Sequence, residues 1–221
     1  MKKFLGVLIS FVVLLTSCTP HDIALAKRCQ SSTVVIHMKV SENKDGKNRE
    51  GWGTCSGVYV SPNVILTANH CIDMPEGVTL HEIWVRNVYD ESDKATVIKA
   101  SPARDLALLK TNLKGTPIRL ARKIKLGEEV WIVGNPLGLE FVVSKGIVSA
   151  TNVEFNAKNP IEHFLTDTVV LPGNSGGPAF NSKGQLIGIV VRSTSMLGTF
   201  GASGLGLVVQ IDEVRRFLKS N

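Results

Sequence analysis

Short runs of alternating apolar and polar residues recur along most of the chain, which is the pattern of half-buried β-strands. Each run is rich in Val, Ile and Leu and is bounded by Gly, Pro, Asn or Ser. One set of expected strands covers residues 33–40, 52–60, 63–69, 81–89, 95–101 and 105–110, and a second covers 129–134, 139–155, 162–170, 178–181, 185–193 and 204–210. Two sets of about six strands predict an all-β protein with two six-stranded antiparallel β-barrels.

Two polar stretches interrupt this pattern. Residues 41–51, "SENKDGKNREG", contain no apolar side chain and are predicted to be a loop. Residues 111–128 break the alternation with a Gly-Thr-Pro segment and basic residues, so we expect one barrel over 32–118 and the other over 119–221. The second barrel ends in "IDEVRRFLK" (211–219), where Ile211, Val214, Phe217 and Leu218 have helical spacing and predict a short docking helix.

The N-terminus has the layout of a secretory signal. The letters "MKK" precede an apolar run over residues 4–15, which is too short for a transmembrane helix because a span needs about 20 residues. The run ends in "LTSC", which resembles the lipobox of bacterial lipoproteins, so residues 1–18 are expected to be the signal region, with lipid on Cys18 and a tether over 19–31. Ordinary cleavage after Ala26, at "ALA" (24–26), is the alternative. Both predict export to the periplasm or cell envelope, as a membrane-anchored lipoprotein or a secreted protein.

The charge of the chain does not indicate a nucleic-acid partner. The formal net charge is +6, and Lys2 and Lys3 of the signal region contribute to it. The other basic residues are scattered and are not interleaved with aromatic ones, which favours a solvated surface.

Three cysteines follow the signal region. Cys55 and Cys71 bracket one apparent hairpin, so a disulfide would join its two strands in an oxidising compartment. A metal site is the alternative, but Cys55, His70 and Cys71 lack the paired short spacings of structural zinc sites. Cys29 is left over: it is free, paired between molecules, or an exchange partner in the unfolded chain.

The stretch "LPGNSGGP" (171–178) places Ser175 in a run that suits neither helix nor strand. Glycine permits positive φ and close backbone approach, so such a loop can aim successive N–H groups at one point. This would suit a nucleophile beside an oxyanion site. A surface turn is the alternative, because Gly, Pro, Asn and Ser dominate turns for conformational reasons alone.

A serine nucleophile needs a base to take its proton and a third group to orient that base. His70 follows an expected strand in "LTANHC", and Asp105 opens the apolar strand of "ARDLALLK". Taken singly, each could be structural. Together they have the order His, Asp, Ser, which is the chymotrypsin order and differs from those of subtilisin and the α/β-hydrolases.

The chain resembles the trypsin-like peptidases, and the bacterial HtrA/Deg branch in particular. The resemblance rests on "LTANHC" (66–71), "RDLALLK" (104–110), "VGNPLGL" (133–139), "SKGIVSA" (144–150), "TDTVVLPGNSGGPAF" (166–180) and "GLGLVV" (204–209), and it runs from about residue 33 to 218. It implies the chymotrypsin-like fold, serine endopeptidase activity on proteins or peptides, and no cofactor or metal.

The resemblance also implies a role for each site residue. Ser175 would attack the peptide carbonyl, His70 would act as general base and then acid, and Asp105 would orient the imidazole. The oxyanion hole would lie at Gly173, Asn174 and Ser175. Digestive members have Asp where this chain has Asn174, so activation by an ion pair to a new N-terminus is not expected. HtrA enzymes usually carry C-terminal PDZ domains, and the sequence ends soon after its helix, so regulation by a PDZ domain is not expected either.

The same resemblance predicts an apolar specificity pocket. Val169, six residues before Ser175, would lie at its base, with walls from Val190, Val191, Leu207 and Val208. No counter-charge would meet Lys or Arg, so small or medium apolar side chains should fit best.

The alternative to an enzyme is a binding protein. An exported binding protein could retain this fold and be catalytically silent, because loop geometry can hold a complete triad inactive. A purely structural lipoprotein would not explain the three motifs. The physiological substrate and the oligomeric state cannot be read from the sequence.

Overall fold

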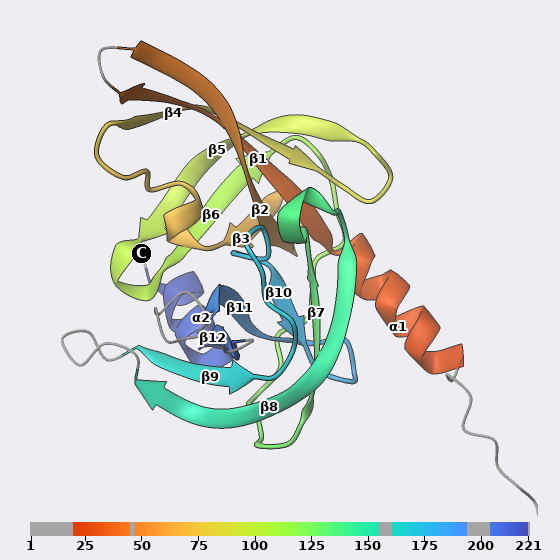
Figure 1. The fold of residues 1–221 in the computed structure, drawn as a ribbon. Coiled ribbons are helices and arrows are strands. Elements are labelled where there is room, and N and C mark those ends of the chain that lie inside the picture. The colour runs from red at the N-terminus through yellow and green to blue at the C-terminus, as the bar shows by residue number, and fades with distance from the viewer. Residues whose placement is uncertain (1–19, 45–46, 155–160, 194–203, 221) are drawn as a thin grey trace, which may run out of the picture.

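Two closed β-barrels make up most of the molecule and lie one above the other in Figure 1. The computed structural model describes residues 20–44, 47–154, 161–193 and 204–220. The first barrel closes in the order β1, β2, β3, β6, β5, β4, and the second in the order β10, β11, β12, β9, β8, β7. All of these pairings are antiparallel, so the predicted fold class is confirmed.

The strands follow the predicted runs with modest shifts at their ends. The first barrel contains β1 Thr33–Lys44, β2 Lys47–Ser61, β3 Val64–Thr67, β4 Val78–Arg86, β5 Ser92–Ser101 and β6 Leu106–Thr111. The second contains β7 Glu129–Gly134, β8 Val142–Glu154, β9 Glu162–Thr166, β10 Pro178–Phe180, β11 Leu186–Ser193 and β12 Gly206–Gln210. The predicted barrel boundary at residues 118 and 119 falls between β6 and β7.

Three short 3-10 turns lie next to strand ends, where loops carry functional groups. They are η1 Asn69–Cys71 after β3, η2 Pro102–Arg104 between β5 and β6, and η3 Pro136–Gly138 after β7. η1 contains His70, η2 directly precedes Asp105, and η3 bonds the loop that carries Ser175 through the Leu137 N–H.

One apolar cluster runs across the junction of the two barrels. It joins Val34, Ile36 and Leu66 of the first barrel to Phe180 and Ile189 of the second. A smaller cluster fills the second barrel around Phe164, Ile187 and Val208. Because the first cluster belongs to both barrels, loops at the junction are supported from both sides.

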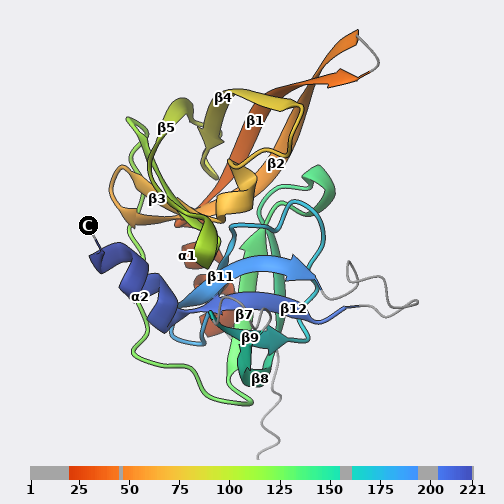
Figure 2. The same ribbon diagram turned by 90° about the vertical axis from the view of Figure 1, so that its left-hand side faces the viewer.

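The polar segment 41–51 is not the loop that we predicted. β1 continues to Lys44 and β2 begins at Lys47, and their register pairs Ser41 with Glu50 and Lys44 with Lys47. The hairpin projects from the first barrel in Figures 1 and 2. Backbone hydrogen bonds can pair two exposed strands without an apolar face, so the alternation rule did not detect this part of the hairpin.

The expected tether is a helix, α1 Pro20–Ser31, and it packs on the body of the protein. Leu25 and Cys29, four positions apart, are buried in the cluster at the barrel junction. Cys29 is a free thiol, and burial raises its pKa to about 12. The predicted signal region and Cys18 lie outside the described residues. Within the described part of the chain, no helix has the length and apolar character needed to cross a bilayer.

The predicted C-terminal helix is present as α2 Ile211–Lys219. It buries Ile211, Val214 and Phe217, and it packs against β11 and β12. In Figure 2 it lies beside the junction of the barrels, close to the turn between β5 and β6.

Candidate active site

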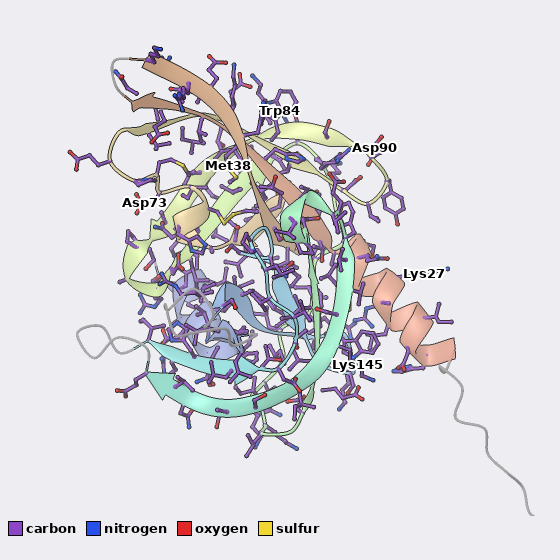
Figure 3. The ribbon with its side chains drawn as sticks, in the orientation of Figure 1. Lys27, Met38, Asp73, Trp84, Asp90 and Lys145 are labelled. Carbon is purple, nitrogen blue, oxygen red and sulfur yellow. A yellow bond between two sulfur atoms is a disulfide. The ribbon has the colours of Figure 1, made fainter. Side chains whose placement is uncertain are left out.

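His70 is the central residue of η1, directly after β3. The neighbouring Cys71 is disulfide-bonded to Cys55 of β2, with Cα atoms 6.2 Å apart, so this predicted pairing is present in the structure. Asn69 Nδ2 also donates to the Asp73 carboxylate at 3.1 Å. Asp73, labelled in Figure 3, marks the position of this turn at the face where the barrels meet. The turn that carries His70 is therefore fixed on both sides.

Asp105 directs both carboxylate oxygens at His70. Its Oδ2 lies 2.7 Å from His70 Nδ1, and its Oδ1 accepts the backbone N–H of His70 at 2.8 Å. The first contact makes Nδ1 the protonated nitrogen, which leaves Nε2 free to accept a proton. Asp105 itself has left-handed backbone angles, with φ 52° and ψ 44°, which are uncommon outside glycine and cluster at functional sites.

Ser175 lies in the loop before β10, and the glycines of this loop are required by its geometry. Gly173 has φ +100°, and a Cβ there would lie 2.1 Å from the Asn135 carbonyl oxygen. Gly176 has φ +78°, and a Cβ there would lie 2.1 Å from Thr67 Oγ1. No other residue type fits both positions, so the loop is not an ordinary surface turn.

One cavity of about 340 Å³ brings the predicted nucleophile and base together. It is lined by Cys55, His70, Val170, Leu171, Pro172, Gly173, Ser175, Val191, Arg192 and Ser193. The structure thus gathers His70 and Ser175 from different barrels onto one wall, with Asp105 behind His70.

Two residues that line this cavity have backbone N–H groups without an acceptor among the described residues. The Pro172 carbonyl accepts the Leu137 N–H of η3 at 2.8 Å, and in a trans peptide the next N–H, that of Gly173, points the opposite way. Within the described part of the chain, neither the Gly173 nor the Ser175 N–H has an acceptor. The Asn174 N–H differs from both because it donates to the Leu171 carbonyl at 3.0 Å. Of the three residues predicted at the oxyanion hole, only Gly173 and Ser175 offer an N–H.

A buried polar network holds this loop, and the sequence analysis missed it. Ser56 Oγ donates to the Gly173 carbonyl at 2.8 Å and accepts hydrogen bonds from Asn135 Nδ2 at 2.8 Å and from the Asn135 N–H at 3.1 Å. Asn135 Oδ1 in turn accepts the Phe141 N–H at 2.9 Å. Ser56 belongs to the first barrel and Asn135 to the second, so the network connects both to the loop that carries Ser175. Asn135 falls in "VGNPLGL", and this motif was the feature of the sequence that could have pointed to it.

The residues predicted to form the specificity pocket are not all together. Val191 lines the cavity of Ser175, but Val169 is 61% exposed and does not line it. Val190 and Val208 are fully buried in the second barrel, and Leu207 lines a neighbouring cavity. The apolar wall near Ser175 is instead made by Val170, Leu171 and Val191.

That neighbouring cavity, of about 430 Å³, lies on the other side of His70. Its lining includes Asp73, Arg104, Asp105, His163 and Leu207. His163 is buried, and its Nδ1 has no hydrogen-bond partner among the described residues. Burial lowers the pKa of His163, and the carboxylates of Asp105 and Glu213 oppose that shift. No group of three or more His, Cys, Asp or Glu in the described ranges could hold a metal ion.

Two antiparallel barrels that present a His–Asp pair and a glycine-bounded serine at their junction define the chymotrypsin-like class of serine peptidase folds. The family model of the trypsin-like peptidase domain matches residues 55–189, and the chain belongs to this family.

The relatives found by sequence are bacterial. A probable periplasmic serine endoprotease DegP-like of Ectopseudomonas mendocina is 35% identical over 184 residues, which are 79% of this chain and 38% of the relative. A protein of the same description from Pseudomonas putida is 36% identical over 171 residues, which are 75% of this chain and 34% of the relative. The chain thus spans little more than a third of these relatives.

Solved structures of HtrA-type proteases share the fold. The structure of HtrA-type protease AlgW with decapeptide superimposes with a TM-score of 0.72 and 26% identity, covering 87% of this chain and 65% of that one. A variant of that protease with decapeptide gives a TM-score of 0.77 at 24% identity, covering 89% of this chain and 64% of that one.

Proposed function

We propose that this protein is an exported serine endopeptidase that hydrolyses peptide bonds in proteins through an acyl-enzyme. The observation that carries the proposal is the shared cavity of His70 and Ser175, with Asp105 bonded to His70 and the Gly173 and Ser175 N–H groups unpaired beside it. A binding protein would have no use for two unsatisfied donors next to a hydroxyl and an imidazole.

The chemistry follows from the position of each group. His70 Nε2 takes the proton of Ser175 Oγ as that oxygen attacks the carbonyl carbon, and the Asp105 carboxylate stabilises the imidazolium. The Gly173 and Ser175 N–H groups donate to the oxygen of the tetrahedral intermediate, where each such donor contributes on the order of 3 kcal/mol in related sites. His70 then protonates the leaving amine, and water repeats the attack on the acyl-enzyme.

Labelling with a fluorophosphonate tests the proposal directly, because the reagent reacts with an activated serine. We expect stoichiometric labelling of Ser175, and no labelling or peptide hydrolysis in Ser175→Ala, with a loss of kcat on the order of 10⁶-fold and unchanged thermal stability. Ser144→Ala, which removes an exposed hydroxyl, is the matched control. A folded wild-type protein that is never labelled and cleaves no protein substrate would instead indicate the catalytically silent binding protein.

We also propose that the exported protein is anchored to the membrane by a lipid on Cys18. Helix α1 supports Cys18 over the alternative site, because cleavage after Ala26 would cut α1 in the middle and remove the buried Leu25. Intact-mass analysis of membrane and soluble fractions tests it. In the wild type we expect a diacylated Cys18 at the N-terminus of the protein in the membrane fraction. The Cys18→Ser variant should not show the mass of the mature lipidated protein. A wild-type N-terminus at Lys27 would contradict the lipid anchor.

A further inference from the structure

The turn that carries Asp105 is attached to the C-terminal helix by an ion pair whose carboxylate is buried and whose guanidinium is half-buried. Arg104, the residue before Asp105, donates from Nε to Glu213 Oε2 of α2 at 3.2 Å. Glu213 is only 3% exposed, and its other oxygen is bonded by Arg216 of the same helix. The pair connects the two barrels, because η2 belongs to the first and α2 follows the last strand of the second.

A second contact joins the same two elements. Lys99, near the end of β5, donates from Nζ to the Phe217 carbonyl at 2.7 Å and to the Ser220 carbonyl, and these carbonyls lie at the C-terminal end of α2. Its ammonium also lies 4.9 Å from the Phe217 ring. Lys99 and Arg104 lie at the two ends of the segment 99–104, which leads from β5 to Asp105. Helix α2 therefore contacts this segment at both ends.

Docking of α2 does not by itself require Glu213. Ile211, Val214 and Phe217 already bury its apolar face, and a buried carboxylate is generally no more stabilising than an apolar residue of similar size. By contrast, Asp105 has left-handed backbone angles, so the turn before it decides where its carboxylate points. Its oxygens bond His70 of η1, and the contact that holds η2 itself from the second barrel is the pair of Arg104 and Glu213.

We propose that Glu213 is a positioning residue: through Arg104 it holds η2 in the geometry that directs both Asp105 oxygens at His70. The inference rests on the proposed peptidase function, in which Asp105 orients the catalytic imidazole. The charged and titratable groups around the pair are Asp105, His163 and Arg216.

The test compares Glu213→Gln with two controls on the same helix. Asp212→Asn removes the neighbouring carboxylate, which pairs with Arg215 and not with η2. Arg216→Gln removes the other partner of Glu213 and leaves Arg104 in place. We expect E213Q to lower kcat by about 10-fold to 100-fold with KM within about twofold, the size of effect that small misplacements of catalytic groups produce. Both controls should keep wild-type kcat.

A proton NMR measurement separates positioning from docking and does not depend on turnover. The proton between His70 Nδ1 and Asp105 Oδ2 should give a downfield resonance in the wild type, Asp212→Asn and Arg216→Gln, and it should move upfield or disappear in Glu213→Gln. A folded E213Q with unchanged kcat and an unchanged resonance overturns the proposal. If the wild type fails to react with fluorophosphonate, the peptidase function fails, while the resonance still decides whether Glu213 positions Asp105.

Arg104→Gln removes the same ion pair by replacing its more exposed partner. This variant replaces Glu213→Gln in the test if Glu213→Gln does not fold. Because Arg104 also lines the cavity beside His70, its own effect could include substrate contacts. The double variant of Arg104→Gln and Glu213→Gln separates the two effects. A loss of kcat no larger than that of one single variant indicates that both residues act through one interaction. Additive losses of kcat overturn the proposal.

Discussion

Ser56 shows how one hydroxyl can connect two barrels to the oxyanion site. It is fully buried and makes three hydrogen bonds, with the Gly173 carbonyl, Asn135 Nδ2 and the Asn135 N–H. By fixing the carbonyl of Gly173, it restrains the peptide units on both sides of that residue. Ser56 therefore restrains the loop that carries Ser175.

Replacement of Ser56 by Ala should lower kcat more than it raises KM, because the Gly173 N–H would no longer be held toward the developing oxyanion. The unsatisfied Asn135 N–H and Gly173 carbonyl should also reduce the free energy of unfolding by about 1–3 kcal/mol, while Asn135 Nδ2 keeps the carbonyls of Val34 and Cys55 at 3.4 Å. Steady-state kinetics and urea unfolding measure the two effects, with Ser144→Ala as the exposed control. A variant that loses stability and keeps wild-type kcat would limit Ser56 to a structural role.

The apolar wall of the Ser175 cavity sets the expected substrate preference. Val170, Leu171 and Val191 line it, no acidic side chain is among its described lining residues, and Arg192 adds a positive charge. A buried cation without a partner is costly, so cleavage after Lys or Arg should be rare. A peptide library scored by cleavage site should show cutting after Ala, Val, Ile or Leu, with neighbouring members differing by only about 10-fold or less. Predominant cleavage after Arg or Lys would refute this pocket.

At the residue scale, the sequence predicted the site residues that belong to local motifs. It did not predict the residues whose role depends on the direction of the side chain. Gly173, Ser175, His70 and Asp105 are in marked local patterns. Val169 was selected by counting from Ser175, yet its neighbour Val170 is the one that turns inward. Residues 169–171 lie outside the strands, so no period of two fixes which of their side chains faces the cavity. Ser56 is a polar residue in a strand, and nothing in the sequence distinguishes it from a surface position.

At the scale of elements, the disulfide joins β2 to the turn η1. The sequence separation of Cys55 and Cys71 is 16, and the bond closes the hairpin beside His70. Its removal should therefore affect both stability and the placement of the His70 imidazole.

The double variant Cys55→Ala with Cys71→Ala should lose roughly 3 kcal/mol of unfolding free energy by the chain-entropy estimate for a loop of this length. Its kcat should also fall, because η1 loses one of its anchors. Urea unfolding with and without reductant measures the first effect, and reduced wild type should match the variant. Cys29→Ala is the control for the remaining thiol. Equal unfolding midpoints for oxidised and reduced wild type would show that the bond adds no stability.

Alternation predicted the strands well and helix α1 not at all. The strands have a buried face that imposes a period of two. Helix α1 is anchored mainly by Leu25 and Cys29, so its apolar stripe is too narrow to stand out in twelve residues. Helix α2 has a wider stripe and was predicted.

At the scale of the whole molecule, two strand sets in the sequence correctly indicated two barrels. The sequence did not reveal how the barrels are held together. The polar contacts that cross the junction include Ser56 with Asn135 and Arg104 with Glu213, and the two residues of each pair are roughly 80 to 110 positions apart along the chain. Pairings of such long range depend on the closed topology, and no local pattern encodes them.

The buried His163 and the half-buried His37 should make the fold sensitive to acid. Burial lowers the pKa of His163 and of His37 below the ordinary value of 6.5, although nearby carboxylates partly oppose the shift in both cases. The unfolded chain therefore binds protons at these positions at a higher pH than the native protein does. Their neutral forms stabilise the fold fully above about pH 6.5, and this contribution is lost progressively as the pH falls from there toward the lowered native pKa values.

The free energy of unfolding should accordingly decrease between pH 7 and pH 5, with a steeper slope in the wild type than in His163→Gln. His37→Gln should flatten the slope less, because His37 is more exposed and lies 3.8 Å from Glu140, which favours its protonated form. Urea unfolding at fixed ionic strength across this range measures the slopes. His81→Gln is the control, since it removes one exposed histidine and so lowers the histidine count by the same number. A His163→Gln slope equal to that of the wild type would show that the acid sensitivity arises elsewhere in the molecule.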